Sequence, residues 1–270
     1  MSDTTVTPAP VTAALCIIGN EILSGRTKDK NIGFLAEELT GIGIQMAEVR
    51  VVRDDEAEII AAVRALSERY SYVFTSGGIG PTHDDITTAC VAKAFGAEVE
   101  RNPEAMRRLT AHYAHSGVEF NDARKKMAEI PVGATLIDNP VSAAPGFVLG
   151  NVHVLPGVPR ILQAMVAGLK PTLVGGPPVL SRTVACTVGE GTVAEGLGAV
   201  QARYPALEIG SYPYFRPGGV FGTSLVLRGT DAALLDAAAA EVRMLVRSFG
   251  GEVIDDELSG NEPSGNESAA

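Results

Sequence analysis

Short apolar runs alternate with segments of helical periodicity over the first third of the chain, and this alternation restricts the fold more than any other feature. Strands that alternate with helices form parallel β-α-β units with right-handed crossovers. The expected strands are residues 13–18, 45–52 and 72–75, and the expected helices are residues 31–39, a segment with Ile59, Ile60, Val63 and Leu66 on one face, and residues 86–95. The prediction is an α/β domain with a mainly parallel sheet.

The pattern continues with one helix and a hairpin, and it changes after a linker. Asn102 and Pro103 predict the start of a helix that runs to about residue 115. Strands are expected at residues 146–149 and 152–155, joined by a tight Gly150-Asn151 turn, and a closing helix at residues 158–169. The stretch "KPTLVGGPPV", residues 170–179, has the composition of a linker.

Beyond the linker the spacing predicts a small β-α-β-β-α unit. Its expected strands are residues 182–188, 207–212 and 219–227, and its expected helices are residues 192–203 and 231–249. Leu234, Leu235, Val242 and Leu245 are expected to cover one face of its sheet. We therefore predict domains at residues 12–170 and 180–254, with disordered tails at residues 1–11 and 255–270.

Charge and apolar content exclude several classes of protein. The formal net charge is −10, and half of it comes from acids of the tail, Asp255, Asp256, Glu257, Glu262 and Glu267. A nucleic-acid partner would need a basic face, so none is expected. The start has no signal peptide, and no apolar run has the roughly 20 residues of a membrane span. Three scattered cysteines, Cys16, Cys90 and Cys186, predict reduced thiols and a cytoplasmic location.

The sequence "SGGIGPTHDD", residues 76–85, directly follows the apolar run 72–75. Glycine allows backbone angles that other residues avoid, and it lets a ligand approach the main chain. Free N–H groups at such a turn, followed by a helix start, bind anions such as phosphate. Carboxylates are poor direct partners for phosphate, so Asp84 and Asp85 indicate a bridging metal ion or an activated water.

Each of these residues also has a purely structural interpretation. The glycines fit a tight turn, and an aspartate favours a helix N-terminus. We assign one acid, Asp84, to helix capping or a supporting position, and Asp85 to the metal or the water. The hydroxyl of Thr87 fits a bond to phosphate and a bond to the backbone equally well. The basic run of residues 124–126 is typical of a solvated surface, with neutralisation of a diphosphate as the second interpretation.

Four stretches in this order, "GNEILSG", "SGGIGPTHDDIT", "NPVSAAPGF" and "LPGVP", resemble the MoaB/Mog-type molybdopterin-binding domain. The resemblance covers residues 14–169, in the form found at the amino terminus of the competence/damage-inducible protein CinA. The second unit is similar to the middle domain that follows it in CinA and in eukaryotic FAD synthases. The resemblance implies a three-layer α/β domain that binds a pterin or a nucleotide through its phosphates.

The resemblance also implies chemistry. In Mog-type adenylyltransferases two aspartates are catalytic, and Asp29 and Asp85 fall at the corresponding places. CinA relatives are similar to nucleotide pyrophosphatases that cleave ADP-ribose with a divalent metal such as Mg or Co, and FAD is a related substrate. This chain departs from the pattern in having Asp29 where Asn is frequent, and His83 where Lys or Arg is common.

Three functions share these residues: a metal-dependent nucleotide pyrophosphatase, a non-catalytic binder of molybdopterin, and a molybdopterin adenylyltransferase. The partner is expected to be a small phosphorylated nucleotide or pterin, and the protein is expected to be a homo-oligomer, a dimer or a trimer. Asp29 and Asp85 are the catalytic candidates, and Asp84 and Asp85 the metal candidates. The candidate ligand-binding residues are Gly19, Asn20, Glu21, Ser76, Gly77, Gly78, Gly80, Pro81, Thr87, Ser142, Gly146, Pro156 and Gly157.

Overall fold

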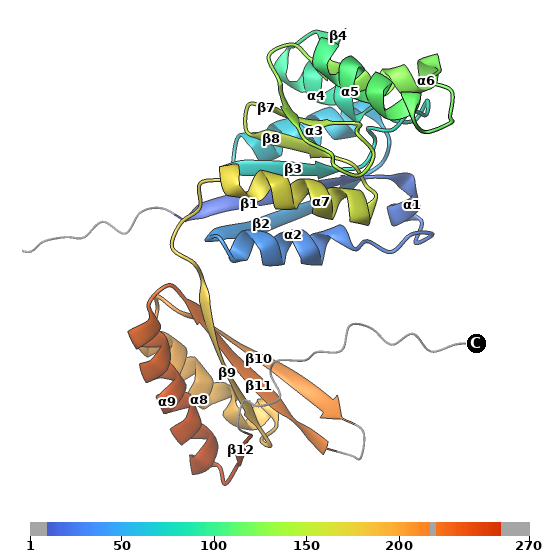
Figure 1. Ribbon diagram of the computed structural model, residues 1–270. Helices are drawn as coiled ribbons and strands as arrows, with labels where there is room; N and C mark the ends of the chain where they lie inside the picture. Colours follow the sequence, from blue (N-terminus) through green and yellow to red (C-terminus); the bar gives the residue numbers. More distant parts are fainter. Residues whose placement is uncertain (1–9, 217–219, 255–270) are drawn as a thin grey trace, which may run out of the picture. The chain divides into compact units, whose positions relative to one another are not determined.

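The computed structural model describes residues 10–216 and 220–254 of the chain. The chain divides into two compact units, with the boundary between Pro178 and Val179 (Figure 1). The predicted tail at residues 255–270, and residues 1–9 of the predicted amino-terminal tail, lie outside the described residues. The predicted amino-terminal tail is wrong at its last residue, because Val11 pairs with Ile44 and begins the first strand.

Unit 1 is built on a six-stranded sheet in the order β2-β1-β3-β8-β7-β6. The neighbours from β2 to β8 run parallel, whereas β7 and β6 are added antiparallel. The strands are β1 (Val11–Ile18), β2 (Ile44–Val52), β3 (Tyr72–Ser76), β6 (Thr135–Ile137), β7 (Gly146–Leu149) and β8 (Val152–Leu155). The predicted mainly parallel sheet is confirmed.

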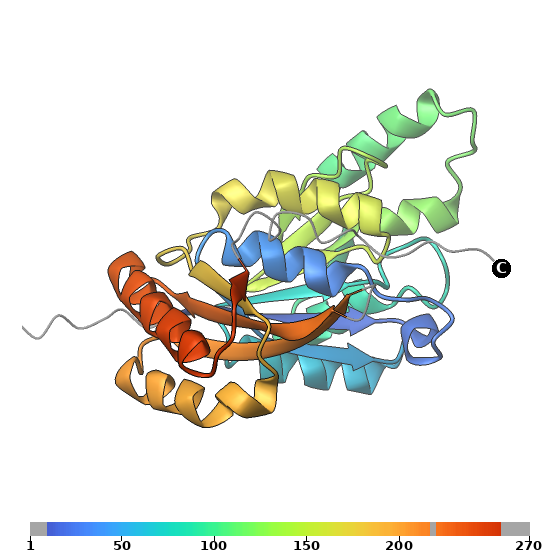
Figure 2. The ribbon, with the colours of Figure 1, turned by 90° about the horizontal axis from the view of Figure 1, so that it is seen from below.

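Helices cover both faces of this sheet and give three layers (Figure 2). Side chains of β1 alternate between two cores: Leu15 packs with α2 and α7 on one face, and Cys16 packs with α3 and α4 on the other. These helices are α2 (Asn31–Thr40), α3 (Glu56–Ser67), α4 (Thr87–Phe95) and α7 (Pro159–Leu169). Because β1 is buried on both faces, its sequence is a continuous apolar run rather than an alternating one.

Several short elements escaped the sequence prediction. They are α1 (Asn20–Leu23), β4 (Val99–Arg101), α6 (Asp122–Lys125), the 3-10 helices at Lys126–Ala128 and Lys170–Thr172, β5 (Glu129–Pro131) and β6. Each has only three or four residues, which is too short to show the periodicity of a helix or of a strand. The predicted helix with Asn102 at its cap is α5 (Pro103–Ala114), and the Asn102 side chain accepts from two backbone N–H groups of its first turn.

Unit 2 has its own core and an antiparallel sheet in the order β10-β11-β9-β12. Its elements are β9 (Leu180–Cys186), α8 (Glu190–Arg203), β10 (Glu208–Arg216), β11 (Val220–Gly229), α9 (Ala232–Ser248) and β12 (Val253–Ile254). The small α+β arrangement is confirmed, with β12 as an addition. Leu234 does not cover the sheet as predicted, because it is 39% exposed, whereas Leu235 and Val242 are fully buried.

A buried histidine links the stability of unit 1 to pH. His153 on β8 is 6% exposed, and its ring lies 5.6 Å from that of Tyr72 and 5.1 Å from that of Phe74. Burial lowers the pKa of His153 below its ordinary value of 6.5, and hydrogen bonding to the backbone of Asn151 and Val73 acts in the opposite direction. The ring is therefore neutral in the folded protein at pH values where the unfolded chain is protonated.

We expect the free energy of unfolding to fall as the pH drops below 6.5, because the unfolded chain then takes up a proton at His153 before the folded chain does. The limiting slope is about 1.4 kcal/mol per pH unit, and the loss ends below the folded-state pKa. Urea unfolding of wild type and His153→Phe between about pH 7.5 and about pH 5 measures it. His112→Gln, at an exposed position of α5, is the control. Identical pH dependence in all three proteins would contradict the assignment.

Candidate functional site

A cleft of about 570 Å³ lies where β1, β3 and β8 end. Loops that follow these strands meet there, as expected at the carboxyl ends of parallel strands. The connection between β6 and β7 adds a fourth wall with Asn139, Ser142 and Ala144. The cleft is therefore assembled from segments that are far apart in the sequence.

Most of the predicted site residues line this cleft. Those that do are Glu21, Gly77, Gly78, Gly80, Pro81, Asp84, Asp85, Ser142, Pro156 and Gly157. Asp29 and Ser76 line a smaller side cavity of about 60 Å³, which shares Glu21 and Gly157 with the cleft. Gly19, Asn20, Thr87 and Gly146 belong to neither set of lining residues.

The glycines at residues 77 and 78 are required by the backbone itself. Gly77 has φ 111° and Gly78 has φ 69°, in the region that favours glycine. A Cβ atom on Gly77 would lie 2.2 Å from the carbonyl oxygen of Ile18, and one on Gly78 would lie 2.1 Å from Thr87 Oγ1. The turn after β3 therefore packs too closely against β1 and α4 to accept a side chain.

Thr87 belongs to the backbone of this turn rather than to a ligand contact. Its side chain is fully buried, and its Oγ1 donates to the carbonyl of Gly77 at 2.9 Å. Its N–H donates to the carbonyl of Gly78 at 2.9 Å. Of the two interpretations of Thr87, the structure shows the bond to the backbone, so its assignment to the phosphate is wrong for this arrangement.

Three consecutive N–H groups face no partner within the described residues. They are those of Gly78, Ile79 and Gly80, all of which line the cleft. The N–H of Gly77 is not among them, since it donates to the carbonyl of Leu155 at 3.1 Å. Successive backbone N–H groups at a turn of this kind form an anion-binding concavity. The residues available for a phosphate are therefore 78–80 rather than 77–80.

Asp85 closes the next turn onto Thr82. Its Oδ2 accepts from Thr82 N at 2.8 Å and from Thr82 Oγ1 at 2.5 Å, while Oδ1 forms no hydrogen bond within the described part of the chain. Hydrogen bonding with Thr82, and more weakly the charges of His83 and Lys126, lower the pKa of Asp84. The Thr82 hydroxyl has a single proton, and in this structure it donates that proton to Asp85 Oδ2.

Neither acid caps the following helix. The cap position of α4 is Ile86, and no side chain forms a cap hydrogen bond there. The expectation that Asp84 caps the helix is therefore wrong. Both carboxylates stand at the cleft without a cationic side chain in ion-pair contact, among the residues that the structure describes.

Asp29 has a structural task at the start of α2. Its Oδ1 accepts from the N–H groups of Asn31 at 3.0 Å and Ile32 at 2.8 Å. Asn31, which is 3% exposed, donates through Nδ2 to Ser76 Oγ at 2.9 Å and to the carbonyl of Gly157 at 3.0 Å. Asn31 thus joins the end of β3 to the loop after β8. The sequence analysis did not single out Asn31, although it lies only two residues after Asp29.

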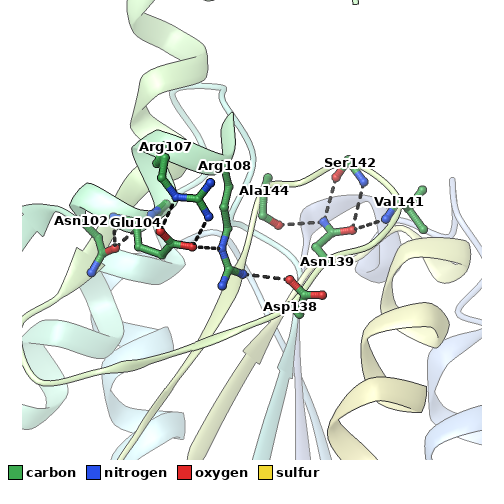
Figure 3. Close-up of polar contacts among 10 residues, drawn as sticks. Asn102, Glu104, Arg107, Arg108, Asp138, Asn139, Val141, Ser142 and Ala144 are labelled. Atoms are coloured by element: carbon green, nitrogen blue, oxygen red, sulfur yellow. Dashed lines mark hydrogen bonds and ion pairs between the residues drawn. The ribbon is translucent and has the colours of Figure 1, made fainter. Parts of the chain in front are cut away.

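The fourth wall is organised by another buried asparagine, Asn139 (Figure 3). Its Nδ2 donates to Ser142 Oγ at 2.8 Å and to the carbonyl of Ala144 at 2.7 Å, and its Oδ1 accepts from two backbone N–H groups of the same loop. Arg108 holds the neighbouring Asp138 at 2.9 Å (Figure 3). Asn139 opens the quoted stretch "NPVSAAPGF", so the motif itself carried the signal.

The remaining predicted residues have structural roles. Gly146 is buried in β7, where a Cβ atom would lie 2.3 Å from the carbonyl oxygen of Val154. Gly146 does not line the cleft, and the close contact between strands is sufficient to explain the glycine. Gly19 N donates to Val52 O, and Asn20 N donates to Asp54 Oδ2 at 2.9 Å. Asp54 lines the cleft and was not predicted.

A divalent metal fits this cleft as a companion of a phosphorylated ligand. No group of three or more His, Cys, Asp or Glu side chains converges on one point within the described residues. Magnesium is typically held by one or two carboxylates together with water and substrate phosphates. Asp84 and Asp85, beside the free N–H groups of residues 78–80, offer that kind of donor set.

The fold defines an α/β domain with a cleft at the carboxyl ends of its parallel strands. A family model described as "Probable molybdopterin binding domain" matches residues 14–174, and one described as "FAD synthase, middle domain" matches residues 178–250. The chain belongs to the molybdopterin-binding domain family, and the match to the FAD synthase middle domain follows directly after it in the sequence. The predicted family is thereby confirmed.

Individual relatives agree with this assignment. A protein of Pyrobaculum arsenaticum is 40% identical over 205 residues, which cover 73% of this chain and 77% of the relative. A CinA-like protein of Syntrophus aciditrophicus is 36% identical over 209 residues, 73% of this chain but 50% of the relative. The crystal structure of the protein CinA from Thermoplasma acidophilum has 37% identity and a TM-score of 0.55, covering 60% of this chain and 98% of that one.

Proposed function

We propose that this protein is a metal-dependent hydrolase of a nucleotide diphosphate bond, with an ADP-ribose-like or FAD-like substrate. The observation that supports it most is the run of N–H groups at Gly78, Ile79 and Gly80, which have no partner among residues 10–216 and 220–254 and lie in one cleft with two carboxylates. Such a pairing suits a diphosphate that arrives with a divalent cation. The N–H groups bind the phosphate oxygens, and the cation balances the acids.

In this proposal, the groups that line the cleft have different roles. Asp85, with Asp84 beside it, holds the metal, which offsets phosphate charge and lowers the pKa of a bound water. The N–H groups of residues 78–80 stabilise negative charge on the phosphate as it develops. Glu21 and Ser142, on the walls of the cleft, contact the sugar or ring. Asp29 contributes by fixing the start of α2 rather than by contact with the substrate.

The family match leaves two other candidate functions. In the first of them the cleft holds a pterin or its nucleotide adduct without turnover, and in the second, which the resemblance to Mog-type adenylyltransferases suggests, the same phosphate site transfers an adenylyl group to the pterin. These functions differ in what leaves the cleft. Hydrolysis releases AMP without an acceptor, adenylyl transfer needs the pterin, and a binder releases nothing.

The test is release of AMP from ADP-ribose and from FAD by pure protein, with Mg²⁺, with Co²⁺ and with a chelator. Hydrolysis predicts AMP in the presence of metal, and its loss on chelation. Absence of AMP with all metals, together with calorimetric binding of ADP-ribose, would replace the hydrolase with the binder. The cytoplasm is the proposed compartment, in agreement with free, buried thiols at Cys16, Cys90 and Cys186.

We further propose that unit 2 serves assembly into a homo-oligomer. Three large rings of its β10–β11 hairpin are exposed: Tyr212 by 54%, Phe215 by 85% and Phe221 by 59%. Phe215 and Phe221 form a cross-strand pair between β10 and β11. Pro213 lies on the edge strand β10 and has no backbone N–H to donate, which favours cover by side chains over the addition of a strand.

A chain ended after Pro178 should remain folded and lose its oligomeric mass. Folding is expected because the two core clusters of unit 1 contain no residue of unit 2. Light scattering gives the mass, and ADP-ribose binding reports the state of the cleft. The full-length double variant Phe215→Ser, Phe221→Ser is the matched variant and should dissociate as well. An oligomer that survives both changes would assign assembly to unit 1.

A further inference from the structure

The turn of residues 82–85 lies between the glycines of the cleft and α4, and it carries both candidate acids. Within the turn, Asp85 N donates to the carbonyl of Thr82 at 3.3 Å, a long contact. The carboxylate of Asp85 is folded back onto Thr82. Bonds inside the turn alone do not explain how the two carbonyls at its ends, those of Thr82 and Asp85, are fixed.

A lysine from a distant segment holds both of these carbonyls. Lys126 Nζ donates to Thr82 O at 2.8 Å and to Asp85 O at 2.8 Å. Hydrogen bonds from a charged donor are roughly twice as strong as neutral ones. No ion pair joins Lys126 to Asp84 or Asp85 among the described residues, so the ammonium group holds the backbone and leaves the two carboxylates to the cleft.

The position of Lys126 is itself fixed on both sides. Before it, α6 is capped by Asn121, and the ring of Tyr113 stacks on Phe120 with centroids 5.0 Å apart. After it, Ala128 is buried, and its carbonyl accepts from Asn102 N at 2.9 Å. Because the backbone on both sides of Lys126 is fixed, its ammonium group can hold the two carbonyls in place. A lysine on a mobile segment would move together with the carbonyls instead.

Lys126 also lies at the border between the site and a second cavity. This cavity, of about 120 Å³, is lined by Lys126 and Asp85 together with apolar side chains such as Ile130 and Phe147. It shares Gly80 and Asp85 with the cleft. Without the two bonds from Lys126, the turn has free space on this side into which it can move.

We propose that Lys126 is a positioning residue of the site: by holding the carbonyls of Thr82 and Asp85 together, it sets the turn that presents Asp85 to the cleft. This inference deepens the proposed hydrolase function and rests on it for its kinetic test. The adjacent Lys125 is the natural control, because its Nζ bonds to Asp122 at 2.9 Å on the surface. Replacement of either lysine removes the same charge from the same segment.

The kinetic test compares Lys126→Met with Lys125→Met in Mg²⁺-dependent release of AMP from ADP-ribose. A misplaced catalytic group costs about 100-fold in rate, so kcat should fall by that order in Lys126→Met. KM should change little, because the N–H groups of residues 78–80 still hold the phosphate. Lys125→Met should behave as wild type. A kcat within twofold of wild type in Lys126→Met would overturn the proposal.

Chemical rescue separates positioning from general loss of structure. Lys126→Cys, treated in the folded state with bromoethylamine, regains an ammonium group at nearly the length of lysine. The three native thiols are buried, and burial raises the pKa of Cys16 to about 12 and that of Cys90 to about 11, so they should stay unmodified. Recovery of kcat after modification supports the proposal. A modified protein that stays as slow as the cysteine variant overturns it.

A measurement without turnover keeps the proposal testable if wild type releases no AMP. Hydrogen exchange should be faster in Lys126→Met at the amides of Asp85 and Thr87, which donate to carbonyls of this turn and of Gly78. Lys125→Met should leave both amides unchanged. Unaltered exchange in Lys126→Met would overturn the role of Lys126, whereas absence of AMP from wild type with altered exchange would overturn the hydrolase function alone.

Discussion

Asp85→Asn should lower metal-dependent AMP release by about two to four orders of magnitude, the range for loss of a group that acts in proton transfer or water activation. The amide keeps an oxygen that accepts from Thr82 N but has no charge to hold a cation. No cap hydrogen bond at α4 depends on Asp85, so the melting temperature should stay within about 4 °C of wild type. Steady-state kinetics and thermal unfolding give the two numbers.

Asp84→Asn is the matched variant for this change, since it removes the same charge one residue away. A larger loss in Asp84→Asn than in Asp85→Asn would exchange the roles of the two acids. Retained turnover in Asp85→Asn would end its assignment as metal ligand. Calorimetric titration with Mg²⁺ in the presence of ADP-ribose separates weaker metal binding from slower chemistry.

Gly78→Val should destabilise unit 1 by about 3 kcal/mol or more, because strain in the left-handed region adds to overpacking. The Cβ atom would lie 2.1 Å from Thr87 Oγ1, which is itself bonded to Gly77. From the sequence, this substitution would have been a test of phosphate binding alone. The structure makes it first a test of folding, measured by urea unfolding.

Gly157→Ala is the variant that reports on the ligand instead. Its Cβ would lie 3.4 Å from the Cα of Gly77, an ordinary contact, and its φ lies outside the left-handed region. Stability should therefore change little, while the methyl group narrows the cleft between the loops after β3 and β8. We expect weaker ADP-ribose binding by calorimetry. Unchanged affinity in Gly157→Ala, or wild-type stability in Gly78→Val, would contradict this account of the cleft.

The sequence predicted those helices and strands that are long enough to show a complete period of apolar residues. The hairpin strands at residues 146–149 and 152–155 agree with β7 and β8 because a tight Gly150-Asn151 turn separates two apolar runs. The strands β4, β5 and β6 have three residues each, so periodicity could not identify them. The order of strands in the sheet follows from long-range pairing, which local pattern does not contain.

At the site, the sequence identified the loops more securely than the tasks of single residues. Asp29 fits a catalytic acid and a helix cap equally well by residue type, and three-dimensional placement shows it bonded to the start of α2. Lys126 belongs to a run of three basic residues that look alike in sequence. Its contact with residues more than forty positions away distinguishes it, and local pattern carries no information on such a contact.

Because the cleft is assembled from distant segments of unit 1, binding of a ligand can be detected through the stability of this unit, without an assay of catalysis. Glu21, Ser142 and Gly157 meet there although the chain between them is long. A molecule that binds the native state alone adds about 2.7 kcal/mol of stability at a concentration of 100 Kd. All lining residues precede Pro178, and the core of unit 2 is separate. In a calorimetric scan, a bound ligand should therefore raise the unfolding temperature of unit 1 and leave that of unit 2 unchanged.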